Sequence, residues 1–338
     1  MTQRSTSTRW CLGQMGNRGQ MGSLALAATV AIAVAMPAHA RLRDRLTGSD
    51  SAPNAERINA PGDHDFTLQH GGLTRRYRVH VPPSHQPEQA TALVLVFHGG
   101  GGNMDIQAND RYYGQISKAD QLGYVVVFPN GYSLLPGGKL ATWNAGACCG
   151  AARDKAIDDI GFVRALLAQL KQQFKVDPTR VFATGISNGG MMSYRLACEM
   201  ADSFTAIAAV AGTDNTLSCT PSRTVSVLHI HALDDERVLF NGGAGSQATQ
   251  MTDFVSVPRN MAKWAALNGC QPEPQRVLTV PGAHCEAYSG CRGGSQVKLC
   301  VTETGGHSWP GGRKPLGGAQ GASALSATDL IGDFFMKR

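Results

Sequence analysis

The sequence has little of what would mark several common classes of protein. Only 17% of the 338 residues are charged and 7% are aromatic. No apolar run reaches the roughly 18 residues of a membrane span, so no internal transmembrane helix is expected. No stripe of lysine and arginine interleaved with aromatic residues is visible, so a nucleic-acid partner is not expected either. The hydrophobic content, 42%, is ordinary for a globular protein and excludes wholesale disorder.

Motifs for metals and nucleotides are also missing. The cysteines form no paired C-x2-C knuckles and no His-x3-His accompanies them, so zinc, the rival interpretation of the cysteines, is not favoured. The phosphate-binding pattern G-x-x-x-x-G-K-[ST] does not occur. We therefore expect neither a metal nor a cofactor.

Residues 1–40 have the pattern of a signal peptide for export. Three arginines and no acidic residue accompany an apolar stretch, Leu24–Met36, which only Thr29 interrupts, and the small-residue triplet 38–40 has the form of a cleavage site. An uncleaved membrane anchor is the alternative, but the stretch is short for a span. The sequence thus predicts a secreted protein, extracellular or periplasmic, with no membrane association after cleavage.

Cysteine usage agrees with export. Cys11 lies in the leader, and the even number that remains favours disulfides in an oxidising compartment. We expect the first four of these to pair among themselves, and the last four likewise. The cysteines concerned are Cys148, Cys149, Cys198, Cys219, Cys270, Cys285, Cys291 and Cys300.

Apolar runs alternate with helix-like stretches along the rest of the chain. Predicted strands include 77–81, 93–97, 125–128, 181–183, 207–210, 225–230 and 297–302, and predicted helices 110–122, 159–174, 189–201, 258–268 and 324–336. This alternation predicts one α/β domain over 63–338, with a mostly parallel central sheet flanked by helices, after a flexible lead-in at 41–62. Residues 236–256 are predicted to be an inserted loop of the kind that shapes a substrate pocket.

The pattern G-x-S-x-G occurs at Gly185–Gly189, between a predicted strand and a predicted helix. This context is what a nucleophilic serine requires, because the sharp turn lifts the Ser187 hydroxyl above the sheet at the start of a helix. A tight turn without chemistry is the alternative. A serine hydroxyl also needs a base and an acid, and in this α/β fold class they follow the serine in the order acid, then histidine.

Two acids follow the predicted strand 225–230, and the residues alone leave Asp234 and Asp235 both open. His231 precedes them and is interpreted as structural. Of the two later histidines, His284 falls between cysteines in a predicted surface loop, whereas His307 lies in a glycine-rich turn after a strand. We therefore expect His307 to be the base that takes the proton from the serine.

A hydrolytic serine also needs two backbone donors for the oxyanion. Asn188 follows the serine, and Gly100 lies in the glycine-rich loop after the predicted strand 93–97, so these two residues are the expected donors. A phosphate-binding loop is the alternative there. We expect Trp143 and Trp309 to contribute to the substrate pocket, with bracing of their loops as the alternative.

Five motifs taken together resemble the secreted polyhydroxybutyrate depolymerase/feruloyl esterase family of α/β-hydrolases. They are HGGGGN at 98–103, WNAGACCG at 143–150, DDIGF at 158–162, GISNGGM at 185–191 and GGHSWPG at 305–311. The resemblance runs from about residue 64 to the C-terminus and implies Ser187 as nucleophile and His307 as base. It also implies that the acid is Asp235, the fifth position of a segment that usually reads H-G-T-A-D-x-x-V-P-Y. Here Ala232, Leu233 and Leu239 depart from that pattern.

The expected function is that of a secreted serine esterase acting through an acyl-enzyme. The resemblance implies feruloyl (hydroxycinnamoyl) esters of plant polysaccharide or hydroxybutyrate polyester and its oligomers as substrates, small or oligomeric and possibly polymer-bound. Three alternatives stay open: an acetyl-xylan esterase, a peptidase of the same fold, and a binding protein that has lost catalysis.

Overall fold

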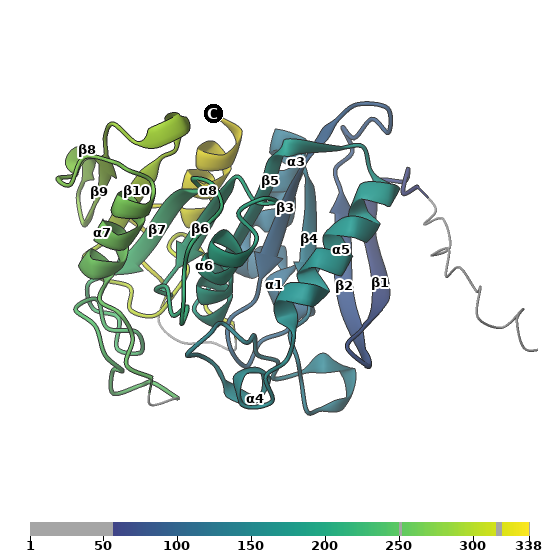
Figure 1. Ribbon diagram of the computed structural model, residues 1–338, viewed down its shortest axis with the longest axis horizontal. Coiled ribbons are helices and arrows are strands. Elements are labelled where there is room, and N and C mark those ends of the chain that lie inside the picture. Colours follow the sequence, from purple (N-terminus) through teal and green to yellow (C-terminus); the bar gives the residue numbers. More distant parts are fainter. Residues whose placement is uncertain (1–56, 250–251, 316–319, 338) are drawn as a thin grey trace, which may run out of the picture. The chain divides into compact units, whose positions relative to one another are not determined.

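The computed structural model describes residues 57–249, 252–315 and 320–337 (Figure 1). The predicted signal peptide, 1–40, and most of the predicted lead-in lie outside the described residues. At the end of the lead-in, the side chain of Ile58 is buried in the core, and the first strand begins at Gly62. None of the helices in the described ranges combines the length and the apolar character that crossing a membrane requires.

One ten-stranded sheet, in the order β1-β2-β4-β3-β5-β6-β7-β10-β9-β8, organises the described chain. The strands are β1 (Gly62–His70), β2 (Leu73–Val81), β3 (Thr91–Phe97), β4 (Val125–Pro129), β5 (Val176–Ile186), β6 (Ala206–Val210), β7 (Ser226–Ala232), β8 (Gln275–Val280), β9 (Ala283–Tyr288) and β10 (Val297–Thr302). The run from β4 to β10 is parallel, and an antiparallel pair lies at each edge. The sequence predicts this mostly parallel sheet correctly.

Helices cover both faces of the sheet (Figure 1). They are α1 (Met104–Gln107), α2 (Asp110–Tyr113), α3 (Gln115–Leu122), α4 (Gly150–Asp154), α5 (Asp159–Gln173), α6 (Asn188–Glu199), α7 (Val257–Leu267) and α8 (Ala327–Met336), with 3-10 turns η1 (Pro136–Gly138) and η2 (Arg292–Gly294). Buried side chains of α5, α6 and α7 form one apolar core with the sheet, and those of α1 to α3 and α8 form the other. Every side chain of β3, β4, β6 and β7 is buried, because apolar helices lie on both sides.

The carboxyl ends of the parallel strands lie level with one another. Phe97, at the end of β3, pairs with Gly185 of β5, and Thr302, at the end of β10, pairs with Ala232 of β7. In a parallel sheet, the loops that leave these ends meet at one edge. The loops beginning at residues 98, 187, 233 and 303 are therefore neighbours, although they are far apart in the sequence.

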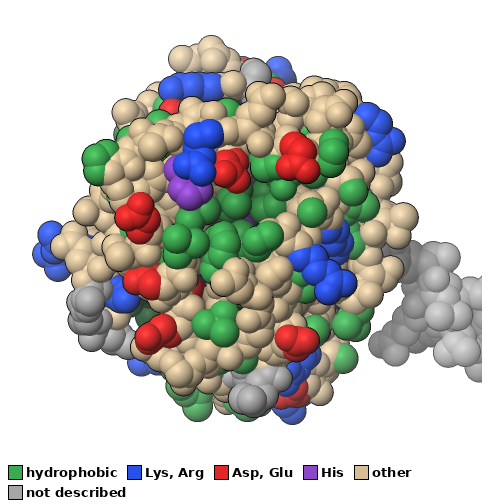
Figure 2. Space-filling model, turned by 90° about the vertical axis from the view of Figure 1, so that its left-hand side faces the viewer, with side chains coloured by type: hydrophobic (Ala, Val, Ile, Leu, Met, Phe, Trp, Pro, Cys, Tyr) green, Lys and Arg blue, Asp and Glu red, His purple; other side chains and the backbone are tan. Residues whose placement is uncertain are grey.

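Several elements differ from the sequence-based expectation. The strand β1 was not predicted, and the segment expected to be one helix at 110–122 is divided at Gly114, whose φ of 63° interrupts the helical backbone. His284, expected in a surface loop, lies in strand β9 of the β8–β9 hairpin. Figure 2 shows the end of the molecule that carries the β8–β9 hairpin. Hydrophobic side chains gather there in a shallow hollow, and charged side chains surround it.

The disulfides fall into the two groups predicted from the sequence. The bonded pairs are Cys148–Cys149, Cys198–Cys219, Cys270–Cys291 and Cys285–Cys300. The Cys285–Cys300 bond joins neighbouring strands β9 and β10. This disulfide therefore holds the antiparallel hairpin to β10, and Cys270–Cys291 joins the segments that precede and follow the hairpin.

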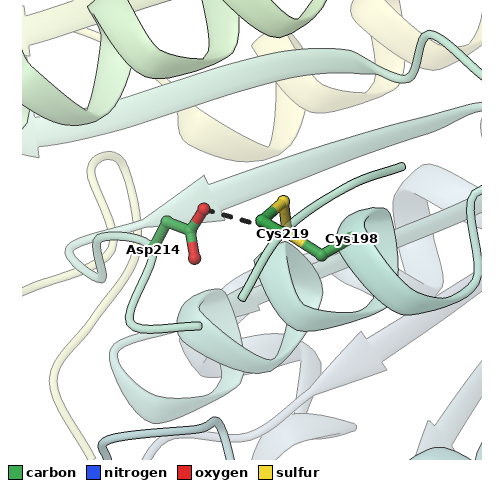
Figure 3. Close-up of side chains that lie close together, drawn as sticks. All are labelled: Cys198, Asp214 and Cys219. Atoms are coloured by element: carbon green, nitrogen blue, oxygen red, sulfur yellow. Dashed lines mark hydrogen bonds between the residues drawn. A yellow bond between two sulfur atoms is a disulfide. The ribbon is translucent and has the colours of Figure 1, made fainter. Parts of the chain in front are cut away.

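Asp214 lies beside the Cys198–Cys219 disulfide (Figure 3). Three such residues within ligand distance of one another resemble a metal site, but sulfur binds metals as the thiolate, and these two sulfurs are bonded to each other. The Asp214 carboxylate instead accepts hydrogen bonds from Lys263 Nζ at 2.7 Å and from Trp264 Nε1 at 3.1 Å. The cluster therefore fixes a loop to helix α7.

Candidate active site

Ser187 occupies a strained turn between β5 and α6. Its φ of 56° lies in the left-handed region that few residues other than glycine adopt. Glycines flank the serine because there is no room for a side chain: a Cβ at Gly185 or Gly189 would collide with the carbonyl of Phe97. This geometry presents the Ser187 hydroxyl at the N-terminus of the twelve-residue helix α6, where the helix dipole favours negative charge.

His307 and Asp235 meet beside that serine. The Nδ1 atom of His307 lies 2.8 Å from Oδ2 of Asp235, and the Asp235 side chain is fully buried. The Nε2 atom of this imidazole therefore remains for the serine side of the site, because Nδ1 is occupied by the carboxylate. Ser187 and His307 line the same cavity, although no hydrogen bond joins the serine hydroxyl to a described residue. Such contacts are often long in the absence of substrate and shorten when it binds.

The neighbouring acid has a different task. Oδ1 of Asp234 accepts the backbone N–H of Gly306 at 2.7 Å, and Oδ2 accepts that of Gly305 at 3.2 Å. Asp234 thus holds the turn that carries His307 without touching the imidazole. The two acids that the sequence alone left open are separated by their partners: Asp235 contacts the ring, and Asp234 contacts the backbone before it.

The Asp235 carboxylate is surrounded by donors. Oδ1 accepts the backbone N–H groups of Arg237 at 2.8 Å and Val238 at 3.0 Å. Burial alone would raise the pKa of Asp235. The hydrogen bonds from His231 and His307, together with the electrostatic attraction of these two rings, outweigh burial and hold that pKa well below its usual range. The carboxylate is therefore ionised at neutral pH and can stabilise a protonated imidazole at His307.

The two expected oxyanion donors lie at the same cavity as Ser187. Asn188 is the first residue of α6, where a backbone N–H has no partner within the helix. Gly100 lies in the loop after β3, and a Cβ there would lie 3.6 Å from the Cβ of Asn188. Within the described ranges, the Gly100 N–H meets no acceptor. Both N–H groups are thus available to an oxygen at this cavity.

His98 holds the loop that carries Gly100. The Nε2 atom of His98 accepts the Gly131 N–H at 2.9 Å, and Nδ1 lies 2.8 Å from the carbonyl of Gly99. Because a carbonyl only accepts, Nδ1 carries the proton and the ring is neutral. Burial lowers the pKa of His98 to about 4, which keeps this arrangement intact at neutral pH.

The tryptophans expected in the substrate pocket are not there. Trp143 is fully buried, and its Nε1 donates to the carbonyl of His98 at 3.0 Å. Its backbone exchanges two hydrogen bonds with the side chain of Asn188, at 2.7 and 3.0 Å, so Trp143 fixes the start of α6. Trp309 is 2% exposed, and its Nε1 donates to Thr328 of α8. Both residues brace loops around the site, because core contacts cover their rings.

Two cavities meet at Ser187 and His307. One, of about 200 Å³, has a mainly apolar surface and is bounded in part by the predicted inserted loop. Its side-chain lining, apart from the residues above, is Thr142, Cys149, Met191, Arg237, Val238, Ala248, Thr249 and Phe254. The other, of about 340 Å³, has Gln107, Tyr113 and Lys314 among its lining residues. A substrate with unlike groups on its two sides fits this division.

Sequence reasoning missed the residues that line the smaller cavity. Phe254 comes from the loop before α7 and stands in no recognised motif, and Met191 of helix α6 ends the motif at 185–191 without any indication that its side chain reaches the cavity. The expectation that 236–256 shapes a pocket was the available signal, and this loop does line the cavity through Val238 and Phe254. His284 lines neither cavity that contains Ser187.

Comparisons with known proteins agree with this architecture. The model of the prolyl oligopeptidase family matches residues 112–222. A probable feruloyl esterase C of Aspergillus clavatus is 30% identical over 269 residues, which cover 78% of this chain and 83% of the relative. The chain belongs to the feruloyl esterase family. Feruloyl esterase B of Piromyces equi is 32% identical over 244 residues, but the match covers only 42% of that longer protein and 69% of this chain.

Solved structures support the fold. The acetyl xylan esterase from Aspergillus awamori superposes with a TM-score of 0.52 over 80% of this chain and 98% of that chain, at 13% sequence identity. At that identity the likeness concerns the fold alone. Together with the feruloyl esterase relatives, this fold makes the chain a feruloyl-esterase-like carboxylic ester hydrolase with the α/β-hydrolase fold, as the resemblance in the sequence implies.

Proposed function

We propose that this member of the feruloyl esterase family hydrolyses hydroxycinnamoyl esters of plant polysaccharide through an acyl-enzyme on Ser187. The observation that carries the proposal is the arrangement at the carboxyl edge of the sheet. There Asp235 contacts Nδ1 of His307 at 2.8 Å, and His307 shares a cavity with a serine held in a strained turn. These are the partners that a serine hydroxyl needs to become a nucleophile.

The proposed reaction has two halves. Oγ of Ser187 attacks the ester carbonyl while Nε2 of His307 takes its proton, and the oxyanion receives the N–H groups of Gly100 and Asn188. The C–O bond to the sugar then breaks, and the sugar hydroxyl leaves with the proton from His307. Water attacks the acyl-enzyme in the same way, with His307 as base, and releases the free acid and the Ser187 hydroxyl. No cofactor takes part in these steps.

The cavities favour an acyl group with one aromatic ring. The smaller cavity, about 200 Å³, lies below the size usual for drug-sized ligands and is lined by Met191 and Phe254, which suit a flat ring. We assign the acyl group to it and the sugar side to the larger cavity, whose Gln107, Tyr113 and Lys314 offer polar contacts. The names of the relatives, feruloyl esterases B and C, support the same substrate class.

A labelling experiment tests the mechanism, and a rate comparison tests the substrate. An aryl phosphonate is expected to label Ser187 stoichiometrically in the parent protein and not in the Ser187→Ala variant, whose kcat should fall by several orders of magnitude with its melting temperature retained. Substantial residual turnover by that variant would refute the assignment. Methyl ferulate, acetylated xylan and a hydroxybutyrate oligomer then compete in one panel, and a higher kcat/KM for either of the last two would overturn the hydroxycinnamoyl proposal.

We further propose that the protein is exported and that residues 1–40 are removed. The basic, then apolar, leader and the four disulfides support this proposal. Mass spectrometry of the protein from the producing cells is expected to find a mature N-terminus at residue 41. A full-length protein retained in the cytoplasm would contradict it.

A further inference from the structure

Behind Asp235, a row of buried polar side chains leads away from the cavity. The Nε2 atom of His231 lies 3.3 Å from Oδ2 of Asp235, and Nδ1 of His231 lies 3.1 Å from Nε2 of His229. The hydroxyl of Tyr194 lies 2.9 Å from Nδ1 of His229, and Nδ2 of Asn260 donates to that hydroxyl at 2.8 Å. None of these four side chains is more than 1% exposed. The proposed mechanism uses none of them.

The end of the row nearest the active site fixes one set of protons. Nε2 of His231 lies 2.8 Å from the backbone carbonyl of Val238, which can only accept a hydrogen bond. Nε2 of His231 must therefore carry a proton, and in the neutral ring Nδ1 must accept. The partner of that Nδ1 is Nε2 of His229, which must then be a donor.

The far end of the row fixes the protons independently. The backbone N–H of Asp214 donates to Oδ1 of Asn260 at 3.0 Å, so the amide of Asn260 points its NH2 group at Tyr194. Since the Tyr194 oxygen receives that N–H, its own O–H is free to donate to Nδ1 of His229.

The two ends require the same state of His229. From one side its Nε2 must donate, and from the other its Nδ1 can accept, which is one neutral tautomer with both nitrogens satisfied. Burial, together with the neighbouring His231 ring, lowers the pKa of His229 well below its usual value, so this neutral state persists at neutral pH. Every donor in the row therefore points toward Asp235.

We propose that Asn260, Tyr194, His229 and His231 act as a unidirectional chain of hydrogen bonds that positions the Asp235 carboxylate for catalysis. The proposal rests on the proposed role of Asp235 as the acid of the triad. The four are positioning residues, since none of them lines a cavity that contains Ser187.

His231 acts on the carboxylate from two sides. Its Nε2–H lies against Oδ2 of Asp235, which is the oxygen that contacts His307. The same N–H donates to the backbone carbonyl of Val238, and the backbone N–H of Val238 in turn donates to Oδ1 of Asp235. In the other tautomer of His231, Nε2 would present a lone pair to Oδ2 of Asp235 and to the carbonyl oxygen of Val238 and would repel both. The chain behind His231 excludes that tautomer, because His229 offers its Nδ1 nothing but a donor.

The test is a pair of substitutions that break the chain at different distances. Tyr194→Phe removes one hydroxyl and is expected to lower kcat about three- to tenfold, while His231→Leu is expected to lower it about ten- to a hundredfold, since small displacements of a catalytic group are costly. KM for methyl ferulate should stay within about twofold in both variants, because neither residue lines the cavities. His231→Gln, whose amide N–H can replace Nε2–H, is expected to restore most of kcat.

A matched control separates positioning from packing. Tyr77 is fully buried, and its hydroxyl has no hydrogen-bond partner in the described ranges, so Tyr77→Phe removes the same atom from a core position outside the chain. Its kcat is expected to equal that of the parent. Rates are divided by the concentration of phosphonate-reactive serine, so that a loss of folded protein does not count as a loss of kcat.

Each possible result of these measurements either supports or overturns the proposed hydrogen-bond chain. The proposal is overturned if Tyr194→Phe lowers the melting temperature but keeps kcat per labelled site, if KM rises in place of the fall in kcat, or if His231→Gln is no better than His231→Leu. Failure of the phosphonate to label the parent would instead overturn the proposed function. The two ideas can therefore fail separately.

Discussion

The variants Asp234→Asn and Asp235→Asn distinguish the roles of the two adjacent acids, because each removes one negative charge at nearly the same place. Asp235→Asn keeps the size of the side chain but leaves only one oxygen and adds an NH2 group. If the oxygen keeps the N–H groups of Arg237 and Val238, the NH2 group faces the ring of His307. The imidazole then has to accept at Nδ1, which puts its proton on Nε2, where it cannot take one from Ser187.

The size of the effect follows from this change of tautomer. A serine triad that keeps its geometry but has the wrong imidazole tautomer loses about 10⁴ in kcat, which is about 5 kcal/mol of transition-state stabilisation. Asp234→Asn leaves one oxygen for the N–H groups of Gly305 and Gly306. It weakens one exposed backbone contact and is expected to lower kcat about tenfold at most.

The assay compares kcat for methyl ferulate in the two variants at a pH on the activity plateau, normalised to the concentration of folded protein. Because the two substitutions are adjacent and change the net charge equally, a long-range electrostatic effect would act on both alike. A larger loss in Asp234→Asn than in Asp235→Asn, or equal losses, would refute the reasoning from the hydrogen bonds.

Three further predictions concern stability and substrate choice. His98 has a pKa of about 4 in the folded protein, whereas an unfolded histidine protonates near 6.5. The unfolded chain therefore binds the proton more readily, and the free energy of unfolding should fall by about 3 kcal/mol as the pH drops from 6.5 to 4. A flat profile in chemical denaturation would contradict this. Replacing Cys270 and Cys291 by serine should lower that free energy by about 3 kcal/mol, as expected for closure of a loop with a sequence separation of 21, and an unchanged denaturation midpoint would argue against it. Phe254→Ala should reduce kcat/KM for methyl ferulate about tenfold more than for an aryl acetate, and equal losses would remove Phe254 from the acyl site.

The centre of the sheet was predictable from the sequence because burial on both faces produces continuous apolar runs. The runs at β3, β4, β6 and β7 are short, contain β-branched residues and are bounded by turns, which together indicate buried strands of a parallel sheet. The edges were harder. In β1, apolar Phe66 and Leu68 alternate with polar residues, and the half-exposed strands β8 and β9 resemble loops in composition.

The candidate residues of the site could be named from the sequence, whereas their packing could not. A strand–turn–helix context is local, so the candidate serine could be identified from neighbouring residues. The side on which a tryptophan ring lies is decided by tertiary contacts, and for that reason Trp143 and Trp309 were assigned to a pocket that neither reaches. His229 and His231 did leave a signal, since residues two apart on a strand share a face, but nothing in the sequence showed what they contact.

The Cys285–Cys300 disulfide bears on how the protein has to be produced. It fastens β9 to β10, and a short turn leads from the end of β10 to His307, whereas Ser187 is held by the parallel centre of the sheet. A preparation made in a reducing cytosol is therefore expected to contain a well-formed nucleophile beside a loosely anchored imidazole. Low specific activity in such a preparation would report the oxidation state of the thiols and would say nothing about the choice of substrate.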